Sequence, residues 1–180
     1  MQEHKPKTLS IIHYNDVYEL RGTNKDVCGG ADRFCKLVND IRKEHDSLVF
    51  FSGDLWNPSK LSMTKKGEQM VRVVNYIDTR AACVGNHDLD LGEDQAMYLF
   101  DKCKFPWLLT NVKHIDGTPI AGAQDYSIID HNGIKIGLIG LAEYDWIVTL
   151  AHFDADELRY EDAAKCGDAL AVKLRSLIII

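Results

Sequence analysis

The sequence lacks several features that would place it in a class at once. It has no apolar run long enough to span a bilayer, and residues 1–7 contain no apolar segment of the kind that signal peptides carry. We therefore expect an N-terminal tail over 1–7, no membrane partner and a cytoplasmic location. No internal repeat, low-complexity segment or linker divides the 180 residues, which indicates one domain or most of one.

Paired cysteines and an excess of basic charge are also missing. The five cysteines are odd in number and show no CxxC spacing, which fits a reducing compartment and small, partly buried thiols better than a disulfide framework. The net charge of -6 argues against a nucleic-acid-coating surface, so no nucleic-acid partner is expected. It does not argue against a small phosphorylated substrate, because bound cations can reverse the local field.

Strands and helices alternate over the first hundred residues. Short apolar runs predict strands, and apolar residues at i, i+3, i+4 and i+7 predict helices. The expected strands span 9–13, 47–52 and 81–84, and the expected helices include 34–41, 70–77 and 93–102. This alternation predicts βαβ units and a largely parallel sheet.

The pattern changes in the last third of the chain. Residues 125–130 and 134–140 predict a β-hairpin with an Asn-Gly turn, and a helix is expected over 161–175. The apolar end, 177–180, is typical of a buried strand. An unpaired strand edge promotes association, so we expect a homo-oligomer or strand exchange through this segment.

Polar loops follow three of the expected strands. They contain Asn15-Asp16-Val17-Tyr18, Gly53-Asp54 and Gly85-Asn86-His87-Asp88. Because the carboxyl ends of parallel strands meet at one edge of a sheet, these loops are expected to assemble an active site there.

The residue types in these loops are those of a metal site. Asp16 and Asp54 offer carboxylate oxygens and Asn86 an amide oxygen, a set that suits Mn²⁺, Zn²⁺ or Fe²⁺. Two such cations, about 3.5–4 Å apart, can grip a phosphoryl oxygen and generate a bound hydroxide. Asp54, on the central loop, is the natural bridging ligand.

His87 and Asp90 add acid–base chemistry. His87 would lie close enough to the reacting group to protonate a leaving oxygen, and Asp90 would orient the imidazole and raise its basicity.

Each of these residues also has a purely structural interpretation. Asp16, Asp54 and Asn86 are ordinary turn or capping residues, and a single loop histidine is usually solvated. Asp88, Asp90 and Glu93 could serve as helix N-terminal charges. The structural interpretation does not explain why three such loops follow successive strands. We expect three other histidines to be exposed structural residues and the tryptophans to serve in packing: His114, His131 and His152; Trp56, Trp107 and Trp146.

Taken together, the loops resemble the calcineurin-like metallophosphoesterases, and specifically their 5'-nucleotidase branch. The similar segments are the opening strand and D-x-H loop at 12–18, a GGxAR-like helix start at 29–33, a GD loop at 53–59 and a GNHE-F-D-like segment at 85–90. The resemblance runs from about 8 to 180.

This resemblance implies a four-layer αββα sandwich and a role for each matching residue. Asp16 would bind the first metal, Asp54 would bridge, and Asn86 would bind the second metal and contact the substrate. His87 and Asp90 would be the catalytic pair. Tyr18 stands where the family places a metal-binding His, and a phenol is the weaker ligand.

A second departure concerns the end of the chain. The family places a His shortly after the strand resembling 176–180, a GHxH loop further on and a separate nucleoside-gripping domain, and none of these lies in the 180 residues. We therefore expect 8–180 to be the N-terminal part of a metallophosphoesterase domain, with the sandwich incomplete at its C-terminal side.

Three functional hypotheses follow. The first is a metal-dependent 5'-nucleotidase that hydrolyses a nucleotide phosphomonoester. The second is a catalytically silent truncated domain that serves in binding or assembly. The third keeps the fold and changes the ester to a cyclic phosphodiester or a sulfur-linked substrate, because specificity resides in the site and not in the scaffold.

Overall fold

The computed structural model describes residues 8–22 and 29–178. The expected tail over 1–7, Cys28 and the last two residues of the expected terminal strand lie outside this part of the chain.

A parallel four-stranded sheet forms the centre of the fold. Its strands are β1 (Ile11–Tyr14), β2 (Leu48–Phe51), β3 (Thr79–Cys83) and β4 (Trp107–Leu108), in the order β1-β2-β3-β4. The predicted parallel sheet is confirmed, with each expected strand displaced by no more than two residues.

Helices cover one face of this sheet. They are α1 (Ala31–His45), the short α2 (Ser62–Lys65), α3 (Glu68–Tyr76) and α4 (Glu93–Asp101). The prediction of the buried face of α1 is partly wrong. Val38 is buried as expected, but Leu37 is 58% exposed and Cys35 is buried in its place. Phe51 and Trp107 lie between the sheet and its helices, and Phe100 stacks on Trp107 with ring centroids 4.2 Å apart.

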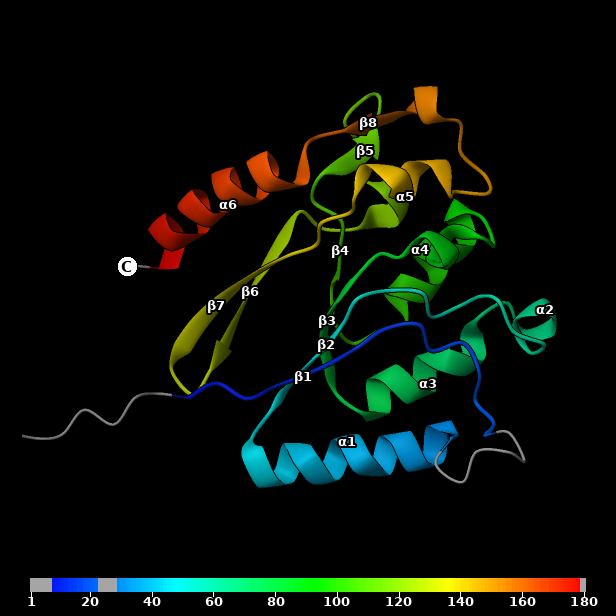
Figure 1. The fold of residues 1–180 in the computed structure, drawn as a ribbon, viewed down its shortest axis with the longest axis vertical. Coiled ribbons are helices and arrows are strands. Elements are labelled where there is room, and N and C mark those ends of the chain that lie inside the picture. Colours follow the sequence, from blue (N-terminus) through cyan, green and yellow to red (C-terminus); the bar gives the residue numbers. More distant parts are fainter. Residues whose placement is uncertain (1–7, 23–28, 179–180) are drawn as a thin grey trace, which may run out of the picture.

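The opposite side of the sheet carries an antiparallel hairpin and a long helix. The hairpin strands are β6 (Tyr126–His131) and β7 (Ile134–Ile139), and α6 (Ala163–Ile178) packs against β7, with Leu174 next to Gly137. Figure 1 shows the resulting order of layers: α1 and α3, the parallel sheet, the hairpin, and α6 outermost. The expected αββα arrangement and the hairpin are thus confirmed.

Shorter elements connect these layers. A small antiparallel pair joins β5 (Val112–His114) to β8 (Leu158–Tyr160). The remaining elements are the 3-10 turns η1 (Asn86–Leu89), η2 (Ile120–Gly122) and η3 (Ala155–Glu157) and the helix α5 (Tyr144–Val148). In the described part of the chain, no helix is long and apolar enough to cross a membrane.

The predicted terminal strand is wrong. Leu177 and Ile178 continue α6, and Ile178 falls four residues after the buried Leu174 on the helix face that meets β7. The helix therefore accounts for the described part of this apolar segment, Leu177 and Ile178. The expected association through this segment remains a prediction.

Candidate active site

The loops that follow β1 and β2 lie side by side. The backbone N–H of Asp16 donates to the carbonyl oxygen of Gly53 at 3.2 Å, and that of Val17 donates to the carbonyl of Asp54 at 3.1 Å. These bonds extend the parallel pairing beyond the strands and bring the first two polar loops together, as the sequence predicts.

Two glycines let the loops after β2 and β3 meet. A Cβ at Gly53 would lie 2.4 Å from the backbone nitrogen of Gly85, and a Cβ at Gly85 would lie 2.2 Å from Oδ1 of Asp54. Gly53 also has a φ of +97°, in the region that side chains rarely adopt. The third loop therefore reaches Asp54 only because both positions lack a side chain.

Asp16 and Asp54 converge on the hydroxyl of Tyr18. This hydroxyl lies 2.8 Å from Oδ1 of Asp16 and 3.0 Å from Oδ2 of Asp54. Both aspartates have left-handed backbones, with φ of +56° and +68°, an uncommon conformation for a side-chain-bearing residue that tends to occur at functional sites. The neutral phenol brings no positive charge to the two carboxylates.

The electrostatics of the cluster reflect this lack. Burial, the hydrogen bond to Asp16 and the charge of Asp54 raise the pKa of Tyr18, which keeps the phenol neutral. Burial also raises the pKa of Asp54, as does the charge of Asp16, against the lowering effect of the hydrogen bonds from His87 and Tyr18. A cation between the two carboxylates would relieve their repulsion.

His87 and Asp90 form the expected pair on the third loop. Nδ1 of His87 lies 2.7 Å from Oδ2 of Asp90, and the backbone N–H of His87 donates to Oδ1 of Asp54 at 3.0 Å. Burial alone would lower the pKa of His87, but the hydrogen bond to Asp90 and the charges of Asp90 and Asp54 raise it. Asn86, half-buried, begins the same 3-10 turn.

Asp88 has a role that the sequence did not predict. It is 1% exposed and accepts backbone hydrogen bonds from Asp54 (2.9 Å), Leu55 (2.8 Å) and Gly85 (2.9 Å). Burial raises its pKa to about 7, the charge of Asp54 acts in the same direction, and the three N–H donors act against both. A capping role for Asp88 explains only its hydrogen bond to Gly85, on the same turn. Its hydrogen bonds to Asp54 and Leu55 join a different loop, and no local pattern in the sequence predicts them.

Asn57 is the second residue that sequence reasoning missed. Its Nδ2 donates to Oδ2 of Asp90 at 2.8 Å. An Asn before a Pro has the appearance of an ordinary turn, so the one available signal was its position on the GD loop.

The donor set fits a divalent cation in part. Asp16 and Asp54 face one point, and Asn86 adds an amide oxygen on the adjoining loop. Within 8–22 and 29–178, no group of three or more His, Cys, Asp or Glu side chains is arranged to hold a metal ion. The residues thus fit a cation between two carboxylates, and they do not by themselves supply the imidazole ligands of a complete two-ion centre.

Other candidate residues have structural roles. Cys83 and Cys103 remain neutral thiols, because burial raises the pKa of each to about 11. Trp56 and Trp107 are buried and pack on each other, as expected. The histidines differ: His152 is exposed as predicted, whereas His114 and His131 are partly buried and lie near Glu93 and Asp46, respectively.

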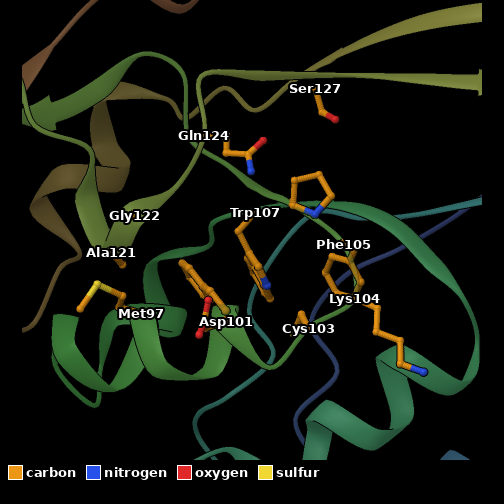
Figure 2. A pocket seen from close by; sticks show the side chains of 12 residues that line it. Met97, Asp101, Cys103, Lys104, Phe105, Trp107, Ala121, Gly122, Gln124 and Ser127 are labelled. Carbon is orange, nitrogen blue, oxygen red and sulfur yellow. The ribbon is translucent and has the colours of Figure 1, made fainter.

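A cavity of about 650 Å³ lies away from these loops. Figure 2 shows it between the end of α4, β4 and the start of β6, with Trp107, Phe105 and Gln124 among its walls. None of the six residues expected in the site lines it. The candidate chemistry is at the carboxyl edge of the sheet, not in this cavity.

The order of the layers and the polar loops at the sheet edge are those of the metallophosphoesterase fold. The sequence profile described as "Calcineurin-like phosphoesterase" matches residues 9–174. The chain belongs to this family, whose members use divalent metal ions.

Named relatives point to one branch of the family. The chain is 28% identical over 148 residues to the snake venom 5'-nucleotidase of Naja atra, covering 73% of this chain and 28% of that protein. It is 27% identical over 176 residues to the NAD 5'-nucleotidase of Haemophilus influenzae, covering 91% and 29%, respectively. The 5'-nucleotidase precursor of Thermus thermophilus has the same fold, with a TM-score of 0.81 at 19% identity, over 93% of this chain and 34% of that one. The chain thus spans less than a third of the length of the curated relatives it matches.

Proposed function

We propose that this chain is part of a metal-dependent phosphoesterase of the 5'-nucleotidase type, which hydrolyses a nucleotide phosphomonoester. The observation that carries the proposal is the convergence of Asp16 and Asp54 on one point, beside the His87–Asp90 pair, at the carboxyl edge of the sheet. The names of the relatives support a nucleotide as the substrate.

Each residue has a distinct task in this proposal. Asp16 and Asp54 would hold one divalent cation, and Asp54 with Asn86 would hold a second; Asn86 would also contact the substrate. When bound, such ions neutralise the phosphoryl oxygens and lower the pKa of water. His87, held by Asp90 through Nδ1, would present Nε2 to the leaving oxygen and supply its proton.

The test uses the protein together with any sequence that its gene encodes beyond residue 180. We expect hydrolysis of nucleoside monophosphates with Mn²⁺, and loss of that activity in Asp54→Ala and in His87→Ala. Asp168→Ala, an exposed carboxylate on α6, is the matched control and should retain activity. Undiminished hydrolysis in both site variants would refute the proposal.

A second candidate is a catalytically silent domain with a binding or assembly role. It is favoured by Tyr18, whose neutral phenol occupies the place of a metal-binding imidazole. Each lost ligand or supporting group typically lowers metal affinity about 10–100-fold. Failure of the chain to bind Mn²⁺ or Zn²⁺ in a calorimetric titration would favour this candidate, and tight binding of two ions would exclude it.

A further inference from the structure

A line of hydrogen bonds runs from the buried start of α2 to His87. Oγ of Ser62 donates to Oδ1 of Asn57 at 2.8 Å, and Nδ2 of Asn57 donates to Oδ2 of Asp90 at 2.8 Å. The same carboxylate oxygen lies 2.7 Å from Nδ1 of His87. Ser62 is 0% exposed, so the line begins at a fixed point in the protein interior.

The carboxylate of Asp90 determines which way the amide of Asn57 faces, because the hydroxyl of Ser62 can pair with either end of that amide. Oγ of Ser62 already accepts the backbone N–H of Ser59 at 2.9 Å, so its single proton points to an acceptor, either Oδ1 of Asn57 or the carbonyl of Ser59 at 2.7 Å. A reversed amide would place Oδ1 of Asn57 against the carboxylate of Asp90, two acceptors without a proton. Nδ2 of Asn57 therefore faces Asp90.

This arrangement in turn fixes the imidazole. Asp90 is an acceptor toward both of its partners, so His87 must carry its proton on Nδ1 to donate to it, and Nε2 is left facing away from Asp90. A carboxylate held by two donors has less freedom to turn than one held by His87 alone. We propose that Asn57, supported by Ser62, is a positioning residue that holds Asp90 and thereby directs His87 toward the leaving group.

That His87 is directed toward the leaving group rests on the proposed function. That Asn57 holds Asp90, and through it the imidazole of His87, does not. The hold on the imidazole is tested by NMR on the ¹⁵N-labelled chain with a chelator present. We expect the wild type to carry its proton on Nδ1 of His87. In Asn57→Leu, which keeps the volume but cannot donate, exchange of that proton with water should be about tenfold faster, the effect of losing one hydrogen bond to a charged group.

Two further variants control for other causes of faster exchange. Ser62→Ala removes only the hydroxyl and should accelerate exchange by a smaller factor of about three. Asn75→Leu is the matched control, because Asn75 bonds only to the backbone of Lys102 and Lys104 among the described residues, and it should leave His87 unchanged. A neutral imidazole that carries its proton on Nε2 and not on Nδ1 in the wild type, or unchanged exchange in Ser62→Ala and in any folded Asn57→Leu, would overturn the proposal.

Leaving-group dependence separates positioning from general damage. Nitrophenolate leaves without a proton, whereas a ribose hydroxyl requires one. Asn57→Leu should therefore lower kcat about tenfold for a nucleoside monophosphate and much less for p-nitrophenyl phosphate, with KM unchanged. Equal losses on both esters would overturn the positioning role. If the wild type hydrolyses neither ester, the proposed function fails, and the exchange measurement still decides the role of Asn57.

Discussion

The buried carboxylate of Asp88 accepts the backbone N–H of Asp54 at 2.9 Å, across two loops that are 34 residues apart in the sequence. The neighbouring N–H groups of Leu55 and Gly85 bind the same carboxylate. Asp88 thus fixes the backbone from which the bridging candidate Asp54 projects.

Replacing Asp88 tests this connection. Asp88→Ala leaves three buried N–H donors without partners, and each costs about 1–3 kcal/mol. We expect the free energy of unfolding to fall by about 3 kcal/mol or more, measured by urea denaturation. Asp168→Ala, on the exposed face of α6, should change it by no more than about 0.5 kcal/mol. Similar small losses in the two variants would contradict the role given to Asp88.

The contact between Gly53 and Gly85 allows a second test. Gly85→Ala would place a methyl group 2.2 Å from Oδ1 of Asp54, so the loops must separate. We expect a loss of about 2–3 kcal/mol in the free energy of unfolding, the range of overpacking in a close-packed site. Gly167→Ala, in α6, meets the flexible ends of Leu141 at 3.3 Å and Ile139 at 3.9 Å and should be neutral or stabilising by up to about 1 kcal/mol. Equal effects would show that the two loops have room to adjust.

The pH dependence of stability reports on His87. Because the folded protein raises the pKa of this imidazole, mainly through Asp90 and against the effect of burial, the protonated form stabilises the folded state. That contribution is complete below about pH 6.5, the ordinary value for His, and is lost as the pH rises through the higher folded-state pKa. The Tm difference between wild type and His87→Gln, measured with a chelator, should be larger at pH 6 than at pH 8. A larger Tm difference at pH 8 would show that protonation of His87 does not stabilise the folded state.

Tyr18 limits metal affinity in this account. Tyr18→His would supply an imidazole, a better ligand for Mn²⁺ or Zn²⁺ than a neutral phenol, at the point where both carboxylates converge. We expect affinity to rise about tenfold or more in a calorimetric titration. Tyr18→Phe removes the phenol without adding a ligand, so it should not give this gain. An equal gain in both variants would mean that the phenol merely blocks the ion.

Periodic patterns predicted most of the fold. The strands before each polar loop, the helices between them and the hairpin around Asn132 all follow from apolar spacing and turn residues, which act locally. The prediction for Leu177 and Ile178 was wrong because a four-residue apolar run has no period of its own; only the apolar stripe shared with Leu174 shows that these two residues continue the helix.

The candidate site was predictable only in its outline. Asp16, Asp54, Asn86 and His87 can be found from the sequence because they follow strands, and the structure brings their loops together. Asp88, Asn57 and Ser62 act through hydrogen bonds to residues on other loops or on the same turn, and a single sequence does not encode such pairings in any visible spacing. Substrate, metal identity and cytoplasmic location remain predictions.

In the proposed function, Asp16 and Asp54 form the cation site of a phosphoesterase. A calorimetric titration of the chain with Mn²⁺, in wild type and in Asp54→Asn, tests it most directly. The account predicts saturable binding in the wild type and an affinity at least about tenfold lower in Asp54→Asn, which keeps the shape of the side chain and removes its charge. Equal affinities in the two proteins, or no binding to the wild type, would contradict it.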